Sequence, residues 1–243
     1  MADERLKRML RSKLSQGICP LCDNTFADLL THHRDQQDTR NVIKGIGLWR
    51  RYVSSVLTSR QRISGYFWDN LSRQPLWQTI WEGIEETPPR IDSIERLLRE
   101  VGIRTPPKKA AWIAKAWKEV DWSRLAKDIN SQVKAGHTRD SNLCAVDVLK
   151  VLRGIGVGPK IRRLMLIWEP YRDANHGRWG FCPYLIPIDA RWIRALNESG
   201  FSVSLADLNS EEKYREVENE LVDASASVGL LPYEADRLIF GSL

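Results

Sequence analysis

The stretch GIGVGPKIRR, residues 154–163, decides how the rest of this 243-residue chain is interpreted. Its three glycines alternate with apolar residues and lead into a proline and a lysine. A phosphate-binding P-loop needs glycine before the lysine and serine or threonine after it, but Pro159 and Ile161 stand at these positions. The dinucleotide fingerprint GxGxxG fails as well, because Pro159 takes the place of the third glycine. The stretch therefore predicts neither kind of nucleotide-binding loop.

A helix, a tight glycine turn and a second helix fit this stretch better. Pro159 suits the first position of a helix, where its missing N–H costs nothing. The three cations that follow would then occupy the first turn, where the helix dipole disfavours each by about 0.3–1 kcal/mol. A bound DNA phosphate would reverse the sign of that cost. The residues expected to contact it are Gly154, Gly156, Gly158, Lys160, Arg162 and Arg163. A basic surface without a ligand is the alternative.

Composition agrees with a nucleic-acid partner without requiring one. The chain has 37 Lys and Arg against 31 Asp and Glu, a formal charge of +6, and 42% apolar residues, which is ordinary for a folded soluble protein. No apolar run reaches the roughly 18 residues of a membrane span, and the first residues lack a secretory signal. We therefore expect an intracellular protein, cytoplasmic and nucleoid-associated or nuclear, without a membrane partner.

Apolar residues follow helical spacing along nearly the whole chain, as in Leu143, Val146, Leu149 and Leu152. The pattern predicts an all-α protein. One long non-helical segment, residues 169–187, interrupts it, and a loop of that length in a compact chain is more often functional than idle.

The motif GVGPK (156–160), followed by PID (187–189), resembles the helix-hairpin-helix DNA glycosylases, a base-excision superfamily. The ending GLLPYEADRLIFG (229–241) is similar to the last helix of its archaeal 8-oxoguanine DNA glycosylases. The resemblance covers most of the chain, although residues 1–40 find no clear counterpart. It implies an all-α, two-lobed fold with a central cleft. Residues 41–168 would form a central helical bundle with a wedge helix and the hairpin, and residues 1–40 plus 169–243 a second lobe carrying the aspartate loop.

The resemblance also assigns roles to individual residues. Lys160 would attack the sugar as a neutral amine, its pKa lowered by burial and by Arg162 and Arg163, while Asp189 would stabilise the positive charge on the sugar. Asp189 could equally be a plain N-cap, and the two roles are compatible. A helix over residues 52–68 would supply a wedge for the gap left by a flipped base, and the last helix would complete the base pocket. The wedge candidates are Arg60, Gln61 and Arg62, and the pocket candidates are Trp68 and Asp236.

These roles predict a monomeric DNA glycosylase with AP-lyase activity that acts on double-stranded DNA carrying a modified base or an abasic site. Oxidised guanine is the favoured base. Two alternatives stay open. One is a monofunctional glycosylase for alkylated or hypermodified bases, such as those of phage genomes, in which Asp189 activates water. The other is a DNA-binding protein without catalytic activity that keeps the hairpin as a phosphate clamp.

Cofactors are not required by this chemistry. The four-cysteine loop that holds an iron–sulfur cluster in other branches of the superfamily is absent, because no cysteine follows Cys182. We expect no such cluster, and a monovalent cation at the hairpin is the one ion that the resemblance suggests. Separately, the N-terminal cysteines and histidines would permit a structural zinc site, although their spacing is poor. Its candidate ligands are Cys19, Cys22, His32 and His33.

Overall fold

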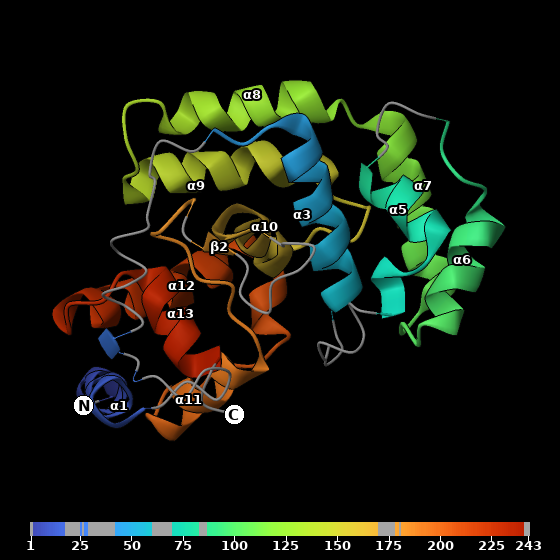
Figure 1. Ribbon diagram of the computed structural model, residues 1–243. Coiled ribbons are helices and arrows are strands. Elements are labelled where there is room, and N and C mark those ends of the chain that lie inside the picture. Colours follow the sequence, from blue (N-terminus) through green and yellow to red (C-terminus); the bar gives the residue numbers. More distant parts are fainter. Residues whose placement is uncertain are drawn as a thin grey trace.

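The structure of the protein is a computed structural model that describes residues 2–17, 25, 27–28, 42–59, 70–82, 87–169, 178–179 and 181–240 (Figure 1). Its helices in chain order are α1 (Ala2–Gln16), α3 (Gly45–Thr58), α5 (Pro75–Glu82), α6 (Ile91–Glu100), α7 (Pro106–Glu119), α8 (Trp122–Val133), α9 (Arg139–Val148), α10 (Pro159–Ile167), α11 (Ala190–Glu198), α12 (Glu211–Ser227) and α13 (Pro232–Phe240). Two short 3₁₀ turns, η1 (Leu149–Leu152) and η2 (Asp207–Asn209), precede α10 and α12.

The described residues are almost entirely helical, as the apolar spacing predicts. The exception is one antiparallel pair of two-residue strands, β1 (Trp168–Glu169) and β2 (Arg178–Trp179), in which Trp168 pairs with Trp179. The pair opens the segment that the sequence marks as a long non-helical excursion. The all-α fold class is confirmed, and this small ribbon is an addition that the sequence analysis did not predict.

The helix expected over residues 52–68 begins earlier and ends earlier. It is α3, which stops at Thr58 because Ser59 takes an extended conformation with ψ of 130°. The buried Lys109 of α7 lies at this end and donates hydrogen bonds to the carbonyls of Leu57 (2.8 Å) and Ser59 (3.1 Å). A cation at the negative end of the helix dipole stabilises the last turn.

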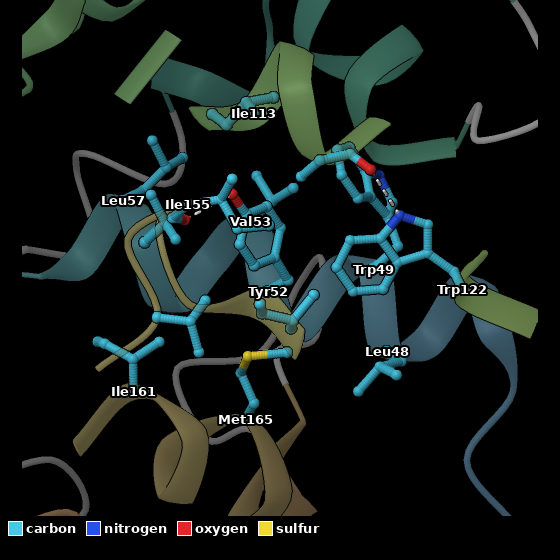
Figure 2. Close-up of a cluster of buried hydrophobic side chains, with 14 of the residues drawn as sticks. Leu48, Trp49, Tyr52, Val53, Leu57, Ile113, Trp122, Ile155, Ile161 and Met165 are labelled. Atoms are coloured by element: carbon cyan, nitrogen blue, oxygen red, sulfur yellow. Dashed lines mark hydrogen bonds between the residues drawn. The ribbon is translucent and has the colours of Figure 1, made fainter. Parts of the chain in front are cut away.

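A first hydrophobic cluster surrounds α3 and runs from Ile43 to Leu185. Tyr52 lies in its middle, and its hydroxyl contacts the carbonyl oxygens of Trp112 (3.1 Å) and Ile155 (3.0 Å). Figure 2 shows Tyr52 and Ile155 together in this cluster, above Ile161 and Met165 of α10. The hydrogen bond between Tyr52 and the carbonyl of Ile155 therefore connects the glycine turn to the first hydrophobic cluster.

A second hydrophobic cluster joins the two ends of the chain. It combines Leu6 and Leu10 of α1 with apolar residues between Ile186 and Ile239. In Figure 1, α1, α11, α12 and α13 gather in the lower part of the molecule, below α8 and α9. The two clusters divide the chain close to the lobes expected from the sequence, except that Cys182 and Leu185 pack with the first cluster rather than the second. The lobes themselves stay a prediction.

A buried ion pair connects the elements of the two clusters. The guanidinium of Arg163 on α10 contacts the carboxylate of Glu218 on α12 at 2.9 Å, and both side chains are 0% exposed. Glu211, at the start of α12, adds a second contact to Arg163 at 2.8 Å. Glu218 also accepts a hydrogen bond from the backbone N–H of Ile186 at 3.0 Å. Helix α10, helix α12 and the loop before α11 are thus held by one carboxylate.

Among the described residues we find no helix that has both the length and the apolar character of a membrane span.

Replacing Glu218 by glutamine should destabilise the protein strongly. The variant leaves the buried Arg163 charge without its main counter-charge, and breaking a buried pair from one side costs about 3–5 kcal/mol. The measurement is the free energy of unfolding from urea denaturation. Glu216→Gln is the matched control, because Glu216 lies on the same helix in an exposed pair with Lys213 and should change stability by less than about 1 kcal/mol. Equal losses in the two variants would contradict the importance of the buried pair.

Candidate active site

The glycine turn has the geometry that a phosphate contact needs. Gly154 and Gly156 have φ of +98° and +86°, which side chains rarely adopt, and α10 begins at Pro159 as the sequence predicts. Gly156 must also be small, because a Cβ there would lie 2.6 Å from Cε3 of Trp112. Within the described chain, the N–H groups of Gly156 and Gly158 donate to no other backbone group. These donors are therefore available to an anion at the start of α10.

Lys160 and Asp189 meet at this end of α10. The lysine Nζ lies 4.0 Å from Oδ2 of Asp189, although 29 residues separate them in sequence. The Lys160 side chain is 39% exposed and that of Asp189 16%. The amine is thus half-buried, next to a carboxylate, and still reachable from outside.

Asp189 is the N-cap of α11, as one of its two readings expects. Its Oδ1 accepts hydrogen bonds from the backbone N–H groups of Arg191 (2.8 Å) and Trp192 (3.4 Å). Its Oδ2 accepts a hydrogen bond from Nε of Arg191 at 2.9 Å. One oxygen therefore caps the helix, and the other binds the arginine side chain. Burial opposes ionisation of this carboxyl, but the Arg191 hydrogen bond and the charge of Lys160 outweigh it and lower the pKa of Asp189.

The loop that carries Asp189 is fixed by a buried tyrosine of α12. The hydroxyl of Tyr214 donates to the carbonyl of Ile186 at 3.0 Å and accepts from the N–H of Ile188 at 2.6 Å. Glu218 accepts from the N–H of Ile186 on the preceding side. Because these partners are all buried, the residue before Asp189 has little freedom, and the carboxylate is held toward Lys160.

The pKa of Lys160 is lowered, chiefly by burial. Asp189 and Asp236 oppose this shift, and the cation that supports it is Arg191. The sequence analysis predicted the direction correctly but named Arg162 and Arg163 as the responsible cations. Their charges are instead directed into ion pairs with glutamates.

The placement of Arg162 and Arg163 argues against the DNA contacts expected of them. Arg162 is 7% exposed and pairs with Glu211, and Arg163 is fully buried between Glu211 and Glu218. Two cations near the N-terminus of α10 would be disfavoured by the helix dipole. Glu211 and Glu218 offset this cost, because they neutralise the two arginines. Of the three cations in GPKIRR, Lys160 is the one that faces the candidate site.

Asp236 on α13 is a second carboxyl near Lys160. It is 6% exposed, and its Oδ1 accepts a hydrogen bond from the indole Nε1 of Trp192 at 2.7 Å. Burial raises the pKa of Asp236 to about 7, and the charge of Asp189 adds to the shift. The carboxyl of Asp236 therefore titrates near neutral pH, whereas that of Asp189 stays ionised.

Several predicted site residues lie outside the described part of the chain. They are the wedge candidates Arg60, Gln61 and Arg62, the pocket candidate Trp68, and the zinc candidates Cys19, Cys22, His32 and His33. Among the described residues, no group of three or more His, Cys, Asp or Glu side chains could hold a metal ion. The wedge and zinc assignments stay predictions.

The residues that orient the site were not predicted from the sequence. Arg191 and Trp192 stand two and three residues after Asp189 in the motif PIDARW, and their position in the first turn of α11 could have identified them as partners of an N-cap carboxylate. Tyr214 and Glu218 carry no such signal. Their role depends on α12 packing against a loop 26 to 32 residues earlier in the chain.

Solved structures with this fold are known. The chain is similar to the 8-oxoguanine DNA glycosylase of Thermotoga maritima, with 19% identity, a TM-score of 0.56, and coverage of 99% of this chain and 96% of that one. It is also similar to the 8-oxoguanine DNA glycosylase of Methanocaldococcus jannaschii, with 19% identity, a TM-score of 0.60, and coverage of 98% and 91%. No protein-family model matches the sequence, and no curated protein matches it significantly. At this identity the likeness establishes a shared fold over the whole chain.

Asp236 should make the stability of the protein depend on pH. Its carboxyl binds a proton more tightly in the folded state, with a pKa near 7, than in the unfolded state, where the ordinary value is 3.8. Between these values the folded state holds the extra proton, so the free energy of unfolding should fall as pH rises from about 4 to about 7. Asp236→Asn should remove this fall and be more stable than the wild type at pH 8, by an amount on the order of a few kcal/mol.

Urea denaturation across this pH range measures the effect. The asparagine keeps an oxygen for the Trp192 indole, so the variant tests the charge and not the hydrogen bond. Asp223→Asn, on the exposed face of α12, is the control and should keep the wild-type pH profile. A wild type whose stability does not change between pH 4 and pH 7 relative to Asp236→Asn would contradict the raised pKa.

Proposed function

We propose that this protein is a DNA glycosylase with AP-lyase activity, which excises a modified base from double-stranded DNA through Lys160. One observation carries the proposal: a half-buried lysine lies 4.0 Å from an N-cap carboxylate, next to a glycine turn in which two N–H groups donate to no backbone group of the described residues. The fold shared with two 8-oxoguanine DNA glycosylases supports it, since both proteins are named for base excision.

The chemistry follows from the charges around Lys160. Its lowered pKa raises the fraction of neutral amine, which is the nucleophilic form. Attack of Nζ on C1′ forms a C–N bond while the bond from C1′ to the base breaks, and the base leaves with the electron pair and takes up a proton. The anionic Asp189 stabilises the positive charge that develops on the sugar and then takes the proton that the lysine nitrogen loses. Opening of the sugar ring then breaks the C1′–O4′ bond, O4′ takes the proton from Asp189, and a protonated Schiff base forms between Lys160 and C1′. Loss of a proton from C2′ then permits β-elimination, which breaks the C3′–O bond and releases the 3′ phosphate.

Asp236 is our candidate for contact with the extruded base. Its carboxyl is buried beside the Trp192 indole and carries a pKa of about 7, so near neutral pH it can either donate or accept a proton in a hydrogen bond. A carboxyl that can donate or accept a hydrogen bond can bind the polar edge of a purine. Oxidised guanine is the base we favour, and alkylated and hypermodified bases are the alternatives for the same assay.

Lys160→Gln should abolish covalent trapping. In the proposed reaction borohydride reduces the Schiff base between Lys160 and an abasic or 8-oxoguanine duplex, which leaves a stable protein–DNA adduct. Glutamine has no nucleophilic amine, so no adduct and no strand cleavage should form. Gel electrophoresis after borohydride treatment measures both. The control is Lys127→Gln, an exposed lysine on α8, which should trap DNA like the wild type.

The same gel separates the rival functions. Base release without strand cleavage or adduct in the wild type would favour a monofunctional glycosylase in which Asp189 activates water. Binding without base release across a panel of modified bases would favour a DNA-binding protein without catalysis. An adduct of undiminished yield with Lys160→Gln would sink the assignment of the nucleophile.

Asp189→Asn should separate the chemical role of this residue from its structural role. Asparagine is about as good an N-cap as aspartate, so α11 should stay folded, and the free energy of unfolding should fall only by the loss of the ion pairs with Arg191 and Lys160. The charge that stabilises the sugar cation is lost, and we expect single-turnover base excision to slow by roughly 100- to 10,000-fold. Excision at the wild-type rate would show that Asp189 acts only as a cap.

A further inference from the structure

Two segments of the sequence contain no acidic residue, namely 101–118 and 148–168. The first forms the turn after α6 and most of α7, and the second forms η1, the glycine turn and α10. Each segment supplies several cations. These are Arg104, Lys108, Lys109, Lys115 and Lys118 in the first, and Lys150, Arg153, Lys160, Arg162 and Arg163 in the second.

The two basic segments pack directly against each other. The indole of Trp112 on α7 lies so close to Gly156 that a Cβ on the glycine would be 2.6 to 3.0 Å from three of its ring atoms. From the other side, the hydroxyl of Tyr52 bonds to the carbonyls of both Trp112 and Ile155. Helix α7 and the glycine turn are therefore fixed to each other by contacts that leave no room for a side chain at Gly156.

Most cations of these segments already have partners. Lys109 is buried on backbone carbonyls, and Arg162 and Arg163 are buried on glutamates. Among the exposed side chains, Lys115 pairs with Glu119 and Lys150 with Asp147.

Lys108 and Arg153 differ from these cations, because within the described chain neither has a carboxylate partner. Lys108 is exposed, and its Nζ lies 4.9 Å from the ring centre of Trp112, the same indole that packs on Gly156. Arg153 is exposed and stands directly before Gly154. The cation–π contact restrains the lysine stem while it leaves the ammonium in water, ready for an anion. The turn thus carries two uncompensated cations, one on each segment.

We propose that Lys108 and Arg153 bind DNA phosphates on either side of the glycine turn, so that α7 and the turn form one phosphate-binding surface. Two exposed cations without a carboxylate partner in the described chain, on a rigid backbone unit whose Gly156 and Gly158 N–H groups donate to no described backbone group, suit the phosphates of a nucleic-acid strand. The proposal rests on the proposed function for its ligand, double-stranded DNA. It adds residues of α7 that the hairpin motif does not contain.

The test measures binding of undamaged duplex DNA by fluorescence anisotropy at several salt concentrations. Each phosphate contact contributes about 0.9 to the slope of log K against log salt, so the double variant Lys108→Gln with Arg153→Gln should lower that slope by about 2. Its affinity at 0.1 M salt should fall by roughly 10- to 60-fold. Lys118→Gln is the matched control, because Lys118 is exposed on the same helix but about 15 Å further along it. The control should bind like the wild type.

Several results would overturn the proposal. They are an unchanged slope in the double variant, an equal loss in Lys118→Gln, and a wild type that does not bind duplex DNA or prefers duplex RNA. Circular dichroism melting of all variants excludes unfolding as the cause of a loss, since the substituted side chains are exposed. Failure of the proposed function looks different. A wild type that binds duplex with the full salt slope but never forms the borohydride adduct would remove the Lys160 chemistry and leave the binding surface intact.

Discussion

The buried contact between Arg163 and Glu218 is the constraint on which the candidate site depends. Both side chains are fully buried, so each charge requires the other, and neither helix can move away without exposing an unpaired ion to an apolar surrounding. Arg163 follows Lys160 by less than one turn on α10. Glu218 holds the N–H of Ile186, three residues before Asp189. A single ion pair therefore fixes the distance between the proposed nucleophile and its carboxylate, although it touches neither.

The parts of this arrangement that a sequence can predict are those decided by neighbours along the chain. Pro159 at the start of α10 and Asp189 at the N-cap of α11 follow from local backbone chemistry, and the structure has both. The positive φ of Gly154 and Gly156 follows in the same way, since a turn this tight between two helices needs residues without a side chain.

The wrong predictions concern sites where the partner of a side chain or of a helix end comes from a distant part of the sequence. Arg162 and Arg163 read as surface cations because the stretch around them holds no acid, yet Glu211 and Glu218 come to them from a helix that begins 48 residues later. The end of α3 is similar. The sequence predicted a helix as far as residue 68, but the buried Lys109 of α7 binds the carbonyls of Leu57 and Ser59, and α3 ends at Thr58. Local propensity is a weak guide when a distant residue supplies the missing charge.

The two carboxyls near Lys160 differ in pKa because Asp189 accepts hydrogen bonds from Arg191, whereas the burial of Asp236 outweighs the opposing effects on it. Arg191 donates to Asp189 through both its side chain and its backbone, so this carboxylate is stabilised even when the lysine has lost its proton. Asp236 receives one neutral indole N–H in a buried site, which compensates little of the cost of its charge. When their environments shift the pKa values of two titratable groups in opposite directions, the two groups suit different chemical roles. Asp189, with its lowered pKa, suits the proposed role beside a sugar cation, while the carboxyl of Asp236, with its pKa near 7, suits the proposed contact with a base edge whose hydrogen-bond donors and acceptors vary. Arg191, to which the sequence assigned no role, is thus the residue whose hydrogen bonds set Asp189 apart from Asp236 and support different proposed roles for the two carboxyls.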